Sequence, residues 1–277
     1  MCGPEANTHP RECGAGGQLT NAVILAAGQG RRLSPLTDTR PKCLVEIAGR
    51  PLLDWQLRAL AQAGVREATV VTGFAAASVE AALSIIAPSM RVTCLHNPFH
   101  AVADNIASAW MARDLFGPDT LLINGDTIFD PRVAVRALAG ARAPLSVTID
   151  RKPSYDADDM KVRIGPDGAL ARIGKTLEGD VDGESIGMIR LRDDGGARFT
   201  AALEAALRDP QALSRWYLSV IDALAEEGGV GVVSIEGLPW AEVDFPRDLA
   251  IAAERAAAFQ FAVEADAAAA GRRRTAG

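Results

Sequence analysis

One segment near the N-terminus constrains this chain more than any other: a short apolar run that ends in a glycine-containing loop. The run at residues 22–27 is followed by Gly28 and Gly30, then by Arg32, and after a proline by Lys42. A run of this length before turn signals is typical of a buried strand. Glycine lacks a Cβ atom, so backbone N–H groups in such a loop can approach an anion, and the cationic side chains add charge. The segment therefore predicts a phosphate-binding site directly after a strand.

Two common phosphate-binding motifs do not fit this segment. The dinucleotide fingerprint needs a third glycine where Leu33 stands, and the P-loop needs Gly-Lys-Ser/Thr after four intervening residues, which is absent. The pattern is instead Leu-Ala-Ala-Gly-x-Gly-x-Arg-Leu with a later Pro-Lys. A tight turn with two solvated arginines is the alternative interpretation.

Composition limits the class of protein. The 277 residues are 48% hydrophobic, and the net charge of −6 with a pI near 5.2 argues against a nucleic-acid partner and favours nucleotide ligands. Cysteines at positions 2, 13, 43 and 94 have neither metal-ligand spacing nor the density of a disulfide scaffold. Residues 1–20 lack the apolar core of a signal peptide, and no run reaches membrane-spanning length. We expect a cytoplasmic protein with a flexible tail at residues 1–20, no membrane partner, and a homodimer as an assembly left open.

Strand-like and helix-like segments alternate along the first half of the chain. Buried parallel strands are expected at 23–26, 68–72, 92–95, 121–124 and 145–149, and helices at 51–63, 74–86 and 106–116. This alternation predicts an α/β fold with a doubly wound, mostly parallel, Rossmann-like sheet.

The second half of the chain changes character. Short strand candidates separated by glycines begin near Asp150 and indicate a small antiparallel acceptor subdomain over residues 150–240. Helices at 199–207 and 216–225 and a strand at 230–235 follow. We assign residues 21–255 to one domain and residues 256–277 to a C-terminal helix and basic tail, with Arg272 to Arg274 at its end.

Two aspartates stand where ligands bind in such sheets, beyond the carboxyl ends of strands. Asp126 follows the strand at 121–124 directly, and Asp244 comes just before the last helix. Because Mg²⁺ takes one or two carboxylates and leaves its other positions to substrate phosphates and water, these two residues are candidate metal ligands. Alternatively, Asp126 caps the next helix and Asp244 pairs with Arg247.

Taken together, these segments resemble the nucleotidyltransferase superfamily, with a MobA-like, sugar-nucleotidyltransferase (GT-A-like) fold. Further segments resemble its CTP:phosphocholine cytidylyltransferase-like branch. They lie at residues 40–45, 97–98, 104–110, 159–162, 183–188 and 240–244, and the resemblance covers about residues 21–255. Two positions depart from that branch, Arg31 in place of Thr or Ser and Asp104 in place of an asparagine.

The resemblance implies roles for individual residues. Arg32 and Lys42 would be catalytic, Mg²⁺ would bind at Asp126 and Asp244, and Lys175 would contact the acceptor phosphate. The nucleotide would be bound by Leu25, Ala26, Ala27, Gly28, Gly30, Asn105, Ser108 and Gly125. The implied reaction is transfer of CMP from CTP to a small phosphorylated or phosphonate acceptor with release of pyrophosphate.

Such a reaction needs no protein base, because a phosphate or phosphonate acceptor is largely dianionic near neutral pH. The acidic run at residues 155–159, with Asp159 at its end, and Glu184 are candidates to meet an acceptor ammonium group. Trp216, Tyr217 and Trp240 are candidates to supply aromatic faces for it. The same residues could instead belong to a solvated turn and to the core. Phosphocholine, aminoethylphosphonate and a polyol phosphate all stay open as acceptors, and the acidic run before Met160 favours the amines.

Three other functions remain open from the sequence. A sugar-1-phosphate or inositol-phosphate nucleotidylyltransferase using CTP, UTP or GTP would share the metal and phosphate loops. A glycosyltransferase would normally carry Asp-x-Asp where this chain has Gly125-Asp126-Thr127. A non-catalytic nucleotide sensor would be expected to lose one of the catalytic charges.

Overall fold

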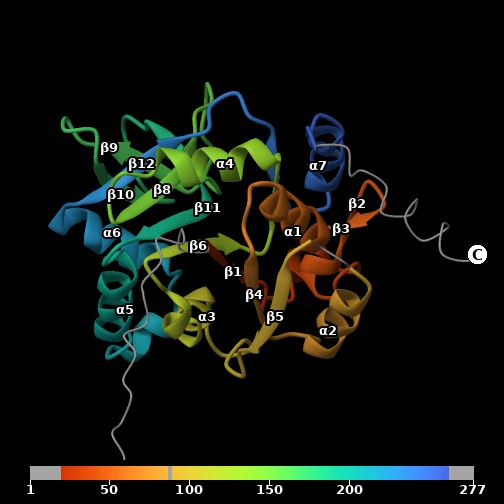
Figure 1. Ribbon diagram of the computed structural model, residues 1–277. Coiled ribbons are helices and arrows are strands. Elements are labelled where there is room, and N and C mark those ends of the chain that lie inside the picture. The colour runs from red at the N-terminus through yellow and green to blue at the C-terminus, as the bar shows by residue number, and fades with distance from the viewer. Residues whose placement is uncertain (1–19, 87–88, 262–277) are drawn as a thin grey trace, which may run out of the picture.

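The computed structural model describes residues 20–86 and 89–261. Residues 1–19 of the expected tail and the arginines at 272–274 lie outside the described residues. Figure 1 shows a central sheet with helices on both of its faces. Within the described residues, no helix is both long and apolar enough to cross a membrane.

Four strands form the parallel part of the sheet. β1 (Asn21–Leu25) lies between β4 (Glu67–Thr72) and β6 (Asp119–Asn124), and β5 (Arg91–His96) pairs with the outer side of β4. The register places Leu25 beside Asn124. The phosphate loop and the Asn124–Asp126 turn therefore begin at the same edge of the sheet. β5 is largely exposed at the sheet edge, so the expectation that 92–95 is buried is wrong.

The second half of the chain, which was expected to bind the acceptor, enlarges this sheet with antiparallel strands. β11 (Gly183–Arg192) runs antiparallel between β6 and β8 (Leu145–Asp150), so β8 does not pair with a neighbouring parallel strand of the first half, as the alternation suggested. β12 (Val230–Ser234) is parallel to β8, while β9 (Lys161–Ile164) and β10 (Leu170–Gly174) extend the antiparallel side. The predicted α/β class with a mostly parallel core and antiparallel additions is confirmed.

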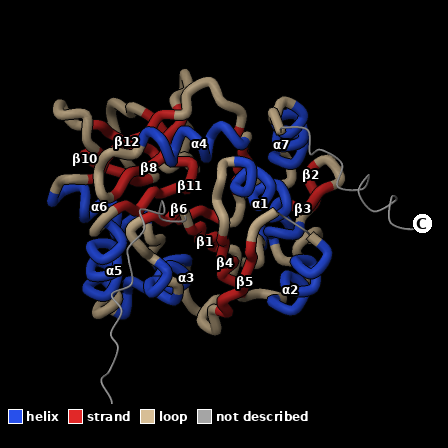
Figure 2. Tube along the Cα trace, viewed as in Figure 1, coloured by secondary structure: helices blue, strands red, loops and turns tan. Residues whose placement is uncertain are grey.

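Alternating side chains of the buried strands create a core on each face, because successive residues of a strand point to opposite sides. Val23 and Leu25 pack toward α3 (Asn105–Met111), α5 (Gly195–Ala206) and α6 (Leu218–Glu227). Ala22 and Ile24 pack toward α1 (Leu52–Gln62), α2 (Ala76–Ile85) and α4 (Pro131–Gly140). Figure 2 shows the strands as a layer between these two groups of helices.

Local sequence explains most helix positions. In α1, Leu53, Leu57 and Leu60 are fully buried at spacings of four and three, as expected for 51–63. The segment at 106–116 divides into α3 and a short 3₁₀ turn at Arg113–Leu115. The last helix, α7 (Asp248–Ala257), begins within the range assigned to the main domain and packs there through Ala252 and Ala256.

Two small strand pairs complete the fold and position the site. β2 (Glu46–Ile47) pairs with β3 (Arg50–Pro51) after the Lys42 segment. β7 (Thr127–Phe129) pairs antiparallel with β13 (Trp240–Glu242), and the N–H of Val243 donates to the Asp126 carbonyl at 3.0 Å. This pairing brings the Asp126 turn and the Asp244 segment together although they are distant in sequence.

Candidate active site

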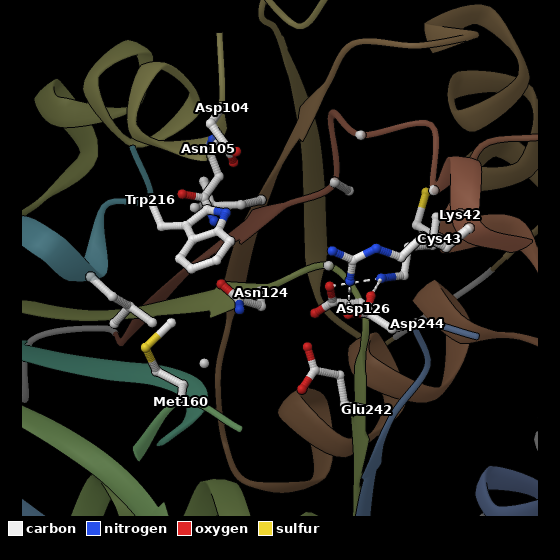
Figure 3. Close-up of a pocket in the computed structure, with 18 of the residues that line it drawn as sticks. Lys42, Cys43, Asp104, Asn105, Asn124, Asp126, Met160, Trp216, Glu242 and Asp244 are labelled. Atoms are coloured by element: carbon white, nitrogen blue, oxygen red, sulfur yellow. Dashed lines mark hydrogen bonds and ion pairs between the residues drawn. The ribbon is translucent and has the colours of Figure 1, made fainter. Parts of the chain in front are cut away.

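A cavity of about 380 Å³ opens at the carboxyl ends of β1 and β6, where the predicted phosphate loop and carboxylates meet (Figure 3). Most of the residues singled out from the sequence line it. They are Leu25, Ala26, Gly28, Gly30, Arg32, Lys42, Asn105, Gly125, Asp126, Lys175, Trp216 and Asp244. Ligands of doubly wound sheets are expected at this position.

The phosphate loop folds back over the Lys42 segment. Gly30 has φ +77°, and a Cβ atom at this residue would lie 2.8 Å from Cβ of Lys42, so only glycine allows the close approach. The hydroxyl of buried Thr37 donates to the Gly30 carbonyl at 2.7 Å. The loop is therefore held against the lysine from within the fold.

Lys42 joins the two carboxylates predicted as metal ligands. Its ammonium group donates to Asp126 Oδ2 at 2.9 Å and also to Asp244 Oδ1, while Arg32 lies 3.3 Å from Asp244 Oδ2. Burial by itself would lower the pKa of Lys42, but attraction to both carboxylates outweighs it and leaves the pKa raised. Burial would raise the pKa of Asp244, and Lys42 and Arg32 lower it below its usual range. Lys42 and Asp244 are therefore both charged near neutral pH.

Neither structural alternative for the aspartates holds. Asp130, not Asp126, caps α4 by accepting from the N–H of Arg132 at 2.8 Å. Arg247 lies 3.6 Å from Asp248 rather than pairing with Asp244. Both candidate ligands instead face the cavity, where Lys42 is their common partner.

A third carboxylate, Glu242, belongs to this cluster and was missed from the sequence. Carboxylate oxygens of Asp126, Glu242 and Asp244 all lie within 4.8 Å of one another. The Glu-x-Asp spacing was the available signal, because residues two apart on an extended segment share a face. Glu242 lines the cavity, and protein atoms surround its carboxyl group on the other sides. The loss of solvent around this group is the larger cause, and repulsion from Asp126 and Asp244 the smaller one, that raise its pKa to about 8.

The acidic cluster suits a hard divalent cation. Asp126 Oδ1 is buried and has no hydrogen-bond partner within the described residues, although a buried carboxylate oxygen normally requires one. The three carboxylates can each offer one oxygen ligand within 4.8 Å of the others, which matches the preference of Mg²⁺ for oxygen ligands. Asp126, Asp244 and Glu242 are therefore the residues that could hold the ion.

A second cavity of about 380 Å³ adjoins the first on the side of α3, and Ala27, Asn105 and Ser108 line it. Ser108 accepts a buried hydrogen bond from Asn97 Nδ2 at 2.9 Å, and the Asn105 Oδ1 atom accepts from the N–H of Tyr217. Asp104 caps α3 and lines both cavities. The predicted nucleotide residues thus lie together, and two of their side chains also stabilise the surrounding fold.

On the acceptor side, Lys175 and Trp216 line the main cavity, and the Lys175 ammonium lies 4.7 Å from the Trp216 ring centroid. Lys161 Nζ donates to the Lys175 carbonyl at 3.0 Å and so fixes this strand end. Asp158 and Met160 also line the cavity. This wall therefore combines a cation, an aromatic ring and a carboxylate.

The other expected acceptor residues do not line the cavity. Lys152, which sequence reasoning missed, lies 2.8 Å from both Asp159 Oδ2 and Glu184 Oε2. Burial raises the pKa of Glu184 to about 7, and the pKa of Asp159 stays lowered because Lys152 outweighs its burial. The Trp240 indole donates to Asp150 Oδ2 at 2.8 Å. These side chains have partners inside the protein and are not among the residues that line the cavity.

Comparison with known proteins agrees with this geometry. Residues 22–230 match the model of the MobA-like NTP transferase domain. The chain is 32% identical to the CMP-5′-(3-aminopropyl)phosphonate synthase of Streptomyces rubellomurinus, over 87% of this chain and 38% of that protein. It is 26% identical to the CTP:phosphoglutamine cytidylyltransferase of Campylobacter jejuni, over 85% of this chain and 100% of that protein.

A solved structure of a CTP:phosphocholine cytidylyltransferase from Streptococcus pneumoniae superposes with a TM-score of 0.68 at 19% identity, covering 85% of this chain and 98% of that one. At this identity the match concerns the fold alone. The chain belongs to the MobA-like NTP transferase family, and it is an enzyme of the nucleotidyltransferase class. The resemblance noted from the sequence is confirmed, whereas the roles of individual residues stay predictions.

Proposed function

We propose that this enzyme transfers CMP from CTP to a small acceptor that carries a phosphonate or phosphate group and an amine, with Mg²⁺ as cofactor and pyrophosphate as the leaving group. The observation that carries the proposal is the meeting of Arg32, Lys42, Asp126 and Asp244 in a cavity that Lys175 also lines. Cations and metal-binding carboxylates are arranged there for two anionic substrates.

The residues present suit phosphoryl transfer by positioning and charge neutralisation. An acceptor oxyanion attacks the α-phosphorus of CTP, a P–O bond forms, and the bond to the pyrophosphate leaving group breaks. Arg32 and Lys42 offset the negative charge that develops on phosphorus and pyrophosphate, while Lys175 holds the acceptor anion. Mg²⁺, bound by Asp126 and Asp244 with Glu242 beside them, would neutralise triphosphate charge and orient it.

The similarity to relatives supports the choice of CTP and of an aminated acceptor. Both relatives are named for CMP or CTP chemistry, one with an aminopropylphosphonate and one with phosphoglutamine. The chain spans 38% of the length of the first relative and the full length of the second. The cationic and aromatic groups of Lys175 and Trp216 fit the anionic and amine ends of such acceptors.

Pyrophosphate release tests the proposal directly. CTP, UTP, GTP and ATP are each combined with 3-aminopropylphosphonate, 2-aminoethylphosphonate, phosphocholine, phosphoglutamine, glycerol phosphate and sugar 1-phosphates in Mg²⁺, and products are identified by ³¹P NMR. We expect kcat/KM with CTP to exceed that with each other nucleotide at least tenfold, about 1.4 kcal/mol of discrimination. A preference for UTP or GTP with a sugar 1-phosphate would contradict the proposal and assign the enzyme to sugar-nucleotide synthesis.

A further inference from the structure

We propose that Asn124 binds the anionic end of the acceptor: its carboxamide N–H donates to a phosphonate or phosphate oxygen of the acceptor, and Tyr217 holds it in that orientation. This inference rests on the proposed function. Asn124 is the last residue of β6, and its side chain stands in the cavity between Trp216 and the Asp126–Glu242 carboxylates (Figure 3).

Tyr217 fixes which end of the amide faces the cavity. Its side chain is fully buried, and its hydroxyl donates to Asn124 Oδ1 at 3.2 Å. A buried hydroxyl without a partner would carry a desolvation cost of about 1–3 kcal/mol, so this contact is strongly favoured. The Asn124 carbonyl also accepts from buried Gln56 Nε2 at 2.7 Å, which fixes the backbone from the other face of the sheet. With Oδ1 occupied, the Nδ2 group is the part left for a ligand.

Gly187 confines the amide from the acceptor side. The residue lies at the register shift of β11 and has φ +70°, and a Cβ atom there would lie 2.4 Å from Asn124 Nδ2. The Thr127 hydroxyl donates to the Ile186 carbonyl at 3.2 Å and holds the bulge beside the Asn124 turn. Bulges beside active sites commonly re-aim side chains in this way. Glycine at 187 therefore leaves the space that the amide occupies.

The Nδ2 group has no hydrogen-bond acceptor among residues 20–86 and 89–261, and it borders the cavity. An amide presents two N–H donors there without adding charge. The strand that confines it, β11, and Met160 beside it belong to the acceptor half, and Lys175 supplies the nearby cation. A ligand with anionic oxygens on that side of the cavity satisfies both the donor and the cation, which is the chemistry of the acceptor's phosphonate or phosphate end.

The test measures acceptor KM, kcat and the Kd for CTP without acceptor in four variants. Asn124→Ala should raise acceptor KM about tenfold, and Asn124→Asp, which replaces the donors with a negative charge, about 30-fold or more. Tyr217→Phe removes only the orienting hydroxyl and should raise acceptor KM about threefold. Gly187→Ala should raise it as well, because it displaces the amide. The Kd for CTP should change less than twofold in all four.

Ile221→Val is the matched control, since it removes a fully buried methyl four residues along α6 and leaves the Tyr217 hydroxyl in place. It should lower the melting temperature by a similar amount to Tyr217→Phe and leave acceptor KM unchanged. If the Asn124 variants keep wild-type acceptor KM, or lose CTP affinity as strongly as acceptor affinity, the inference is wrong while cytidylyl transfer stands. If the wild type transfers CMP to no acceptor in the panel, the proposed function fails and the inference falls with it. Should an Asn124 variant not fold, Tyr217→Phe and Gly187→Ala decide the question.

Discussion

The two sides of the cavity use their charged residues differently. On the nucleotide side, Arg32, Lys42 and the aspartates pair with one another across the site, and all of them line the cavity. On the proposed acceptor side, Lys152 binds Asp159 and Glu184, which do not line the cavity, whereas Lys175, Asp158 and Asp104 do. The first group of charges therefore lines the cavity, whereas Asp159 and Glu184 of the second are paired within the protein.

The difference lies in where the partner of each charge stands: Lys42, Asp126 and Asp244 all line the cavity, whereas Lys152, the partner of Asp159 and Glu184, does not. Lys152 provides internally the ammonium group that Asp159 and Glu184 were expected to receive from an acceptor. Of the acidic run, Asp158 lines the cavity and Asp159 does not, so Asp158 and the Trp216 ring are the groups that we propose for the amine of an acceptor. Four sets of variants test this contrast.

The metal carboxylates should give the largest effect. Asp126→Asn or Asp244→Asn removes a charged oxygen ligand with little change of shape, and we expect kcat to fall by about 10³ or more in saturating Mg²⁺. Pyrophosphate release measures the loss, and circular dichroism should report an unchanged fold. Asp38→Asn is the same change at an exposed residue outside the cavity, whose side chain accepts a hydrogen bond from Ser34, and it should leave the rate unaltered. Turnover of both variants within threefold of wild type would remove the metal assignment.

The cations of the phosphate loop come next. Lys42→Ala or Arg32→Ala should lower kcat by about 10²–10³, because each removes one electrostatic contact to charge that develops in the transition state. The loss should be similar with every acceptor, as measured by kcat/KM across the panel. Arg40→Ala is the control, since this exposed arginine pairs with Glu46 outside the cavity. A loss that depends strongly on the acceptor would indicate that these cations bind the acceptor rather than the nucleotide.

Lys175 tests the acceptor wall. Lys175→Met keeps an apolar stem against Trp216 but removes the charge, and we expect acceptor KM to rise about tenfold, about 1.4 kcal/mol, with the Kd for CTP unchanged. Steady-state kinetics and calorimetry without acceptor separate the two quantities. Arg172→Met, which breaks an ion pair with Asp222 outside the cavity, should alter neither. Loss of CTP binding as severe as in Lys42→Ala would mean that residues 150–240 are not the acceptor half.

Lys152 should affect stability more than catalysis. Lys152→Met leaves two adjacent carboxyls without their counterion, and because Lys152 is one-third exposed we expect a loss of about 1–2 kcal/mol of unfolding free energy at pH 8. Arg151 is an exposed cation that lies 3.9 Å from Glu236. Arg151→Met should change the free energy of unfolding by less than about 0.5 kcal/mol. Urea unfolding measures both variants.

The pKa shifts of Glu184 and Asp159 determine how the stability loss of the Lys152 variant changes with pH. Because the pKa of Glu184 is raised in the folded protein, its contribution to the free energy of unfolding is present below pH 4.5 and is lost as the pH rises through about 7. Asp159 has a lowered pKa, so its contribution is present above pH 3.8 and is lost as the pH falls below that value. Without Lys152 both pKa values should rise, and the deficit of the variant should grow between pH 5 and pH 8. A deficit that is constant over this range would show that the carboxyls do not depend on Lys152.

Much of the nucleotide side could be predicted because its signals are local. The strand before Gly28, the glycine loop and the position of Asp126 after a strand each depend on a few adjacent residues, and parallel strands bring such loops to one edge. Asp244 was found by the same reasoning, and Glu242 could have been found from its spacing to Asp244. The antiparallel position of β11 beside β6 had no comparable signal.

By itself, the sequence determined the class of fold, the phosphate loop and the carboxylates at the strand ends, because hydrophobic period and turn residues act over short distances along the chain. Tertiary structure alone decided which charges are free to meet a substrate. Lys152 reaches Glu184, and Tyr217 reaches Asn124 across 93 positions of sequence. Such contacts depend on strand register and on the bulge at Gly187, and a shift of one residue in register would turn each side chain to the opposite face.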